Sequence, residues 1–138
     1  MTLNTLLARS DFVSLHVPLT NETRGVINCD RLALMKRGSF LINTARGGLV
    51  VERDLVAALQ SGHLSGAALD VFAEEPIPPD NPLLRLDNVL ASPHMSGIDT
   101  QSHEDMAIQS AQNIVDLHRG VWPADSVVNP AVRPGWTW

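Results

Sequence analysis

Short apolar runs alternate along the chain with segments of helical periodicity, and this alternation constrains the fold most strongly. The runs cover residues 12–17, 39–43, 66–72 and 88–91. Short apolar runs bounded by turn signals are typical of strands buried on both faces, as the strands of parallel sheets are. The alternation therefore predicts an α/β layered fold with a parallel sheet of four short strands and flanking helices.

The intervening segments begin and end at residues that commonly cap helices. We expect one helix from Thr2 to about Ser10, one that opens at Asn28 and Asp30, one over 52–60 and one over 100–119. Gly62 and Gly120 follow the last two helices, as glycine often does. Four prolines within residues 75–82 predict an extended loop before the fourth strand.

Composition narrows the class of partner. Ten Lys and Arg against fifteen Asp and Glu give a net charge of -5, and no basic cluster is present to bind phosphates. No apolar run approaches the roughly 18 residues that span a bilayer. The first residues lack a secretion signal, and the single cysteine, Cys29, fits a reducing compartment. We expect a cytoplasmic protein that binds neither nucleic acid nor membrane.

Polar side chains follow the predicted strands at their carboxyl ends, where open parallel sheets bind ligands. His16 ends the first strand, Arg46 follows the second, Asp70 and Glu75 follow the third, and His94 follows the fourth. A histidine exchanges protons near neutral pH, a neighbouring carboxylate fixes its tautomer, and an arginine presents a planar fork to a carboxylate. These residues predict an acid/base site with an anion clamp.

Three segments at these strand ends resemble a known family. They read NTARGG over 43–48, GAALDVFAEEP over 66–76 and SPH over 92–94. In this order and spacing they are similar to the signature blocks of the D-isomer-specific 2-hydroxyacid dehydrogenases, which include phosphoglycerate, glyoxylate/hydroxypyruvate and D-lactate dehydrogenases. The resemblance extends from Leu6 to about Asn129 and implies the second half of a doubly wound, Rossmann-like sheet.

The resemblance also implies roles for single residues. Arg46 would bind the carboxylate and carbonyl of the substrate, His94 would be the general acid and base, and Glu75, rather than Glu74, would orient and polarise His94. Asp70 would contact the nicotinamide end of NAD or NADP. The implied cofactor-binding residues are His16, Pro18, Thr44, Ala45, Arg46, Asp70, His94 and Gly97. The implied reaction is hydride transfer between this cofactor and a 2-hydroxy or 2-keto acid.

The chain lacks motifs that the family has in the first half of its dinucleotide-binding domain. The glycine-rich G-x-G-x-x-G turn and the acidic residue that follows it are absent, and family members are more than twice this length. We therefore expect residues 1–120 to be a partial NAD(P)-binding Rossmann domain. Residues 121–138, with Trp122, Trp136 and Trp138, form a tail expected to dock on another surface.

The missing half leaves several interpretations open. The first strand would lose its neighbour at the switch point of the sheet, and such an exposed edge predicts a homo-oligomer or a complementing N-terminal half. The chain is then a dehydrogenase fragment that is not active alone. The alternatives are a non-catalytic interaction or regulatory module, or a truncated gene product that retains the fold. We expect no metal site, because the five histidines and Cys29 show no ligand spacing.

Overall fold

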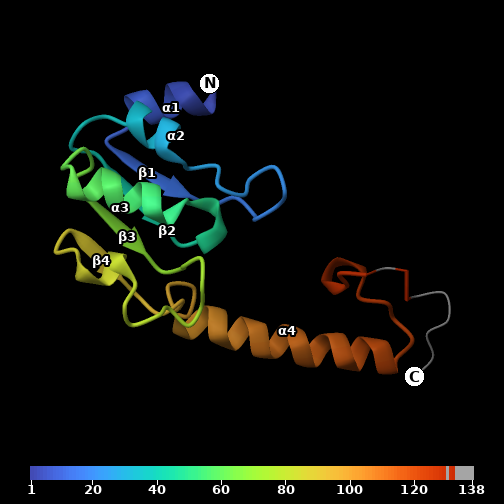
Figure 1. Cartoon of the computed structure of the whole chain (residues 1–138). Coiled ribbons are helices and arrows are strands. Elements are labelled where there is room, and N and C mark those ends of the chain that lie inside the picture. The colour runs from blue at the N-terminus through green and yellow to red at the C-terminus, as the bar shows by residue number, and fades with distance from the viewer. Residues whose placement is uncertain (130, 133–138) are drawn as a thin grey trace. The chain divides into compact units, whose positions relative to one another are not determined.

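The computed structural model describes residues 1–129 and 131–132, and it divides into two compact units, Met1–Ser96 and Gly97–Trp138. The first unit holds the whole sheet and three helices, and the second holds the long helix and the segment after it (Figure 1). The predicted boundary after residue 120 stays a prediction. No helix within the described residues has the length and apolar character needed to cross a membrane.

The first unit contains a four-stranded parallel sheet whose spatial order follows the chain: β1 (Phe12–Leu15), β2 (Phe40–Asn43), β3 (Gly66–Leu69) and β4 (Val89–Ala91). Phe12 pairs with Phe40, and Phe40 with Gly66. The predicted fold class is confirmed, but the first and third strands end earlier than predicted. They end at Leu15 and Leu69 because the pairing with β2 ends at Asn43, and the pairing of β3 with β4 ends opposite Leu69 at Ala91.

Three helices of the first unit cover one face of the sheet: α1 (Leu3–Arg9), α2 (Cys29–Leu34) and α3 (Glu52–Gln60) (Figure 1). α1 and α2 have the predicted caps: the side chain of Thr2 accepts from Thr5 N–H, and that of Asn28 accepts from Arg31 N–H. Two short 3-10 helices, η1 (Gly47–Leu49) and η2 (Pro82–Arg85), lie in the loops after β2 and before β4.

The core lies between these helices and the sheet. Leu7, Leu41 and Leu55 are fully buried there, one each from α1, β2 and α3. On the opposite face of the sheet Phe12, Phe40 and Leu90 are exposed, and they border a hollow of about 470 Å³. β1 is an edge strand of the sheet, as the sequence predicted.

The second unit contains α4 (Thr100–His118) and the 3-10 helix η3 (Ala124–Ser126). A capping box starts α4: Asp99 accepts from Ser102 N–H, and the hydroxyl of Ser102 accepts from Asp99 N–H. None of the α4 side chains is buried. Of the tail predicted to dock on another surface, Trp122 is described, whereas Trp136 and Trp138 lie outside the described residues.

Candidate active site

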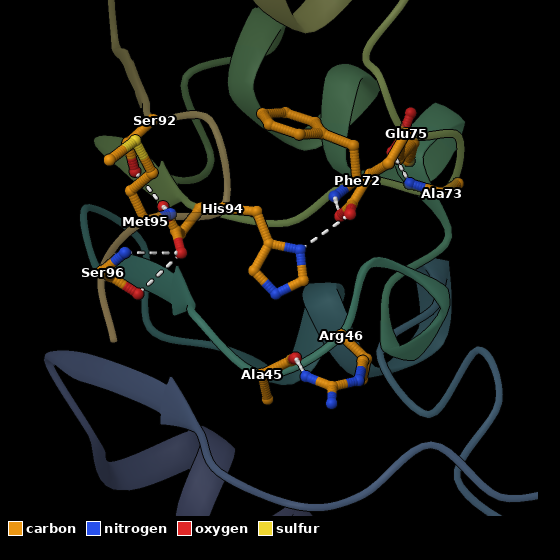
Figure 2. A network of polar contacts seen from close by, with 11 residues as sticks. Ala45, Arg46, Phe72, Ala73, Glu75, Ser92, His94, Met95 and Ser96 are labelled. Carbon is orange, nitrogen blue, oxygen red and sulfur yellow. Dashed lines mark hydrogen bonds and ion pairs between the residues drawn. The ribbon is translucent and has the colours of Figure 1, made fainter. Parts of the chain in front are cut away.

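The loop after β2 is fixed by the last residue of the strand. Asn43 is buried; its Oδ1 accepts from Ala45 N–H at 3.1 Å, and its Nδ2 donates to the Arg46 carbonyl at 2.9 Å. The side chain thus closes the turn that presents Arg46. The guanidinium of Arg46 donates to the Ala45 carbonyl at 2.6 Å, so it stays close to its own turn (Figure 2).

Gly47 brings this turn against the loop after β3. A Cβ built on Gly47 would lie 1.9 Å from the carbonyl carbon and oxygen of Phe72, a distance that no side chain tolerates. Phe72 is itself buried. Glycine is therefore needed at position 47 for the two loops to touch.

The loop after β4 is held by a buried carboxylate from β3's end. Oδ1 of Asp70 accepts from the Ser92 hydroxyl at 2.5 Å and from Met95 N–H at 2.9 Å. Oδ2 accepts from Ser96 N–H at 3.0 Å and from the Ser96 hydroxyl at 2.7 Å. Burial opposes ionisation of Asp70, but these hydrogen bonds outweigh it and hold the pKa of Asp70 well below its ordinary value. The carboxylate of Asp70 thus shapes the loop that carries His94.

His94 has a backbone conformation that few residues other than glycine adopt. Its φ is 56°, in the left-handed region. Such strain persists only where surrounding contacts enforce it, and it is frequent at functional sites. Here the contacts are those of Asp70 with the residues on both sides of His94.

The imidazole of His94 meets the carboxylate of Glu75. Nδ1 of His94 lies 2.8 Å from Oε2 of Glu75, whose Oε1 accepts from Phe72 N–H at 2.9 Å (Figure 2). The Phe72 N–H, the contact with His94 and the charges of His94 and Arg46 lower the pKa of Glu75. Glu75 is therefore ionised at neutral pH and accepts a hydrogen bond from Nδ1–H of His94. The other ring nitrogen, Nε2, lies on the side away from Glu75 and toward Arg46 (Figure 2).

His94 and Glu75 open into a cavity of about 530 Å³ that Asp70, Phe72, Pro76, Ile77 and Pro93 also line. The side chains of His94 and Glu75 remain 48% and 37% exposed, so a small molecule can reach them. A protonatable nitrogen, a fixed carboxylate behind it and a nearby guanidinium can transfer a proton to or from an anionic ligand.

Most of the predicted site residues line one of two hollows. His94, Glu75 and Asp70 line the first. The second, of about 780 Å³, is lined by His16, Val17, Pro18, Leu19, Ala45 and Arg46. His16 also contacts Ser14, whose hydroxyl lies 2.8 Å from Nε2.

Two predicted residues lie outside both linings. Thr44 is half-buried between Asn43 and Ala45, and Gly97 belongs to the second unit. The hydrogen bonds of the Asp70 carboxylate all go to residues 92–96, and its predicted contact with a nicotinamide stays a prediction.

No sequence signal marked the supporting contacts of several site residues, among them Ser92, which lies in the SPH segment that carries part of the resemblance. Ser92 and Ser96 are small polar residues whose importance depends on a buried carboxylate more than 20 residues away. Glu52, in the first turn of α3, contacts the loop that carries Glu75. An acidic residue is common at a helix start, so Glu52 did not stand out. Among the described residues, no group of three or more His, Cys, Asp or Glu side chains could hold a metal ion.

Comparison with known proteins supports one family. The family model described as D-isomer specific 2-hydroxyacid dehydrogenase, NAD binding domain, matches residues 1–96. A glyoxylate reductase from Thermofilum pendens is 47% identical over 94% of this chain, and the match covers 38% of that protein. The chain thus spans about two fifths of the length of this relative.

Solved structures of the same family are similar to this chain. A D-isomer specific 2-hydroxyacid dehydrogenase from Xanthobacter autotrophicus Py2, in complex with NADPH and MES, has a TM-score of 0.75 and 45% identity over 86% of this chain and 48% of its own. The NAD-complexed enzyme of the same class from Lactobacillus delbrueckii ssp. bulgaricus has a TM-score of 0.84 and 33% identity over 89% of this chain and 42% of its own.

Proposed function

This chain belongs to the D-isomer specific 2-hydroxyacid dehydrogenases, and we propose that it supplies the acid/base half of an enzyme that transfers hydride between a nicotinamide cofactor and a 2-hydroxy or 2-keto acid. The observation that carries the proposal is the His94–Glu75 contact of 2.8 Å beside Arg46, at the carboxyl edge of the sheet. The names of the relatives favour a short 2-keto acid such as glyoxylate as substrate.

Arg46, His94 and Glu75 have separate roles in the proposed reaction. Arg46 binds the carboxylate of the substrate and polarises its carbonyl, as a planar guanidinium can. His94 donates a proton from Nε2 to the carbonyl oxygen as the keto acid is reduced, and it removes that proton in the reverse direction. Glu75 accepts from Nδ1, fixes the tautomer and stabilises the charged imidazolium. The contacts on Glu75 and the Asp70 clamp on the His94 loop keep this pair in place.

The residues present fit the nicotinamide end of NAD or NADP. The second hollow has apolar walls at Pro18 and Ala45 for a flat ring, and Arg46 at its border can bind the substrate beside that ring. The cofactor, when bound, donates or accepts the hydride at C2 of the substrate. No glycine-rich phosphate turn occurs in the sequence, so this chain accounts for only part of the cofactor site.

We propose that the active assembly includes further protein, either a complementing N-terminal half or a second copy of the chain. The edge strand β1 and its exposed first residue, Phe12, support this, because an unpaired apolar edge recruits another strand or surface. A cytoplasmic location belongs to the same proposal.

The test is a calorimetric titration of the folded full chain with NADH and with NADPH, followed by turnover of glyoxylate alone and with the N-terminal half of a relative added. We expect His94→Gln to lower turnover at least about 100-fold with little effect on NADH affinity. Arg46→Ala should weaken binding of the keto acid. Arg53→Ala, on the exposed surface of α3, should change neither the turnover nor the binding of the keto acid. Failure of the folded chain to bind either cofactor, alone or complemented, would contradict the proposal.

A further inference from the structure

The carboxylate of Glu52 bridges two points of the loop that carries Glu75, and we infer that Glu52 is a positioning residue for the Glu75–His94 pair. Oε1 of Glu52 accepts from Ala73 N–H at 2.6 Å, and Oε2 accepts from Nδ2 of Asn81 at 3.0 Å. One contact precedes Glu75 in the chain and the other follows it. The inference rests on the proposed function, because only in that function does the Glu75–His94 pair transfer a proton. The contacts of Glu52 and the experiment below do not depend on the proposed function.

Glu52 acts from a rigid base. It lies in the first turn of α3, which is anchored in the core by the buried side chains of Leu55 and Leu59. The side chain of Glu52 is half-buried, so it is confined more than an exposed glutamate would be. The helix therefore fixes where residue 73 lies relative to the sheet.

The effect reaches Glu75 through one peptide unit. Ala73 follows Phe72, and Phe72 N–H donates to Oε1 of Glu75. A loop released at Ala73 is free to rotate the preceding backbone and to lengthen that hydrogen bond. The other oxygen of Glu75 holds Nδ1 of His94, so misplacement of Glu75 also misplaces the imidazole. Glu52 does not line either hollow and thus positions the pair without touching a ligand.

Asp54 offers a matched control. It is the second acidic residue in the first turn of α3, and its Oδ2 accepts from Cys29 N–H at 2.9 Å. Asp54 therefore stabilises the same helix start and makes a similar contact with a distant backbone, but on the side of α2. Substitutions at both positions separate a general loss of stability from a specific effect on Glu75.

The experiment follows the carboxyl carbon of Glu75 by NMR as the full chain, labelled with ¹³C-glutamate, is titrated with acid; Glu75→Gln assigns the signal. In the wild-type chain the Phe72 and His94 contacts keep the pKa of Glu75 below its ordinary value. Glu52→Ala should return that pKa toward the ordinary value. Glu52→Gln should have a smaller effect, because an amide oxygen still accepts from Ala73. Asp54→Ala should leave the pKa of Glu75 where it is in the wild type.

An unchanged pKa of Glu75 in Glu52→Ala, with a loss of thermal stability like that of Asp54→Ala, would overturn the inference. If Glu52→Ala does not fold, Asn81→Ala replaces it: this variant removes the donor to Oε2 of Glu52 and adds no charge that would itself shift the pKa of Glu75. It should raise the pKa of Glu75 in the same direction. The readout needs no turnover, so it decides the role of Glu52 even where NADH fails to bind.

Discussion

Asp70 shows how one side chain at the end of β3 controls the geometry of another loop. Its side chain is buried, and a buried charge is costly unless hydrogen bonds replace its water. Four donors from residues 92–96 do so, and they hold the loop in which His94 takes its left-handed conformation. Asp70 therefore contributes to the site whether or not it touches a cofactor.

Stability should fall in acid through Asp70. Its pKa is lowered in the folded protein, so the unfolded chain takes up the proton more readily, and the stabilisation is complete only above the ordinary value of about 3.9. As the pH falls below that value, the free energy of unfolding should decrease. Urea denaturation at pH 7, 5, 4 and 3 would measure how steeply the free energy of unfolding falls with pH.

Asp70→Asn should make the free energy of unfolding depend less on pH in acid. It should also cost about 2 kcal/mol at pH 7, because an NH2 group replaces one acceptor oxygen and faces donors. Glu75 and Asp99 have lowered pKa values too, so some acid sensitivity remains in the variant. Asp80→Asn, in the exposed loop before η2, is the control. If the free energy of unfolding of Asp70→Asn fell with pH as steeply as that of the wild type, Asp70 would not be responsible for the loss of stability in acid.

The loops after β2 and β3 touch only because residue 47 is glycine. Gly47→Ala should lower the free energy of unfolding by about 3 kcal/mol or more, since its Cβ meets the backbone of buried Phe72 and neither side can yield. In Gly48→Ala the new Cβ would lie 2.9 Å from Cδ2 of Leu19, the end of a flexible side chain. The loss there should be about 1 kcal/mol or less. Equal losses in chemical denaturation of the two variants would contradict this.

The elements of the first unit were largely predictable from sequence. Helix α3 has the predicted bounds, and Thr2 and Asn28 cap the helices they were expected to cap, because capping and helical periodicity are local properties. Strand ends were less predictable. β3 stops at Leu69, inside the apolar run 66–72, because its length depends on where its pairing with β2 and β4 ends.

The site was predictable in its residue types and their place on the sheet, but not in its supporting contacts. Strand ends locate Arg46, Glu75 and His94 on one edge, and the contact between Glu75 and His94 has the expected partners. The left-handed backbone of His94 and the clamps of Asp70 and Glu52 depend on chain segments far apart in sequence. No local pattern marks them.

The first unit as a whole has one face packed and one face open. On the open face Phe12 is 65% exposed and stacks on Phe40 with ring centroids 5.1 Å apart, beside the unpaired edge of β1. We expect the chain to associate, so that light scattering gives a mass above the 15.0 kDa of one chain that rises with concentration.

Phe12→Lys should reduce that association, because a charge on an edge strand opposes pairing. Leu84→Lys, which changes an exposed side chain of η2 that does not line the hollow on the open face, should leave the association intact. A wild-type chain that scatters as a monomer at all concentrations would refute the expectation.

The parallel order of the sheet also has a consequence for folding kinetics. Each strand pairs with one roughly 25 residues further along, so no hairpin can form early and each pairing must close a long loop first. Arg46, Glu75 and His94 follow three successive strands, and they meet only after β2, β3 and β4 have paired. The Glu75–His94 contact follows β3 and β4, so its appearance in refolding reports that these two strands have paired.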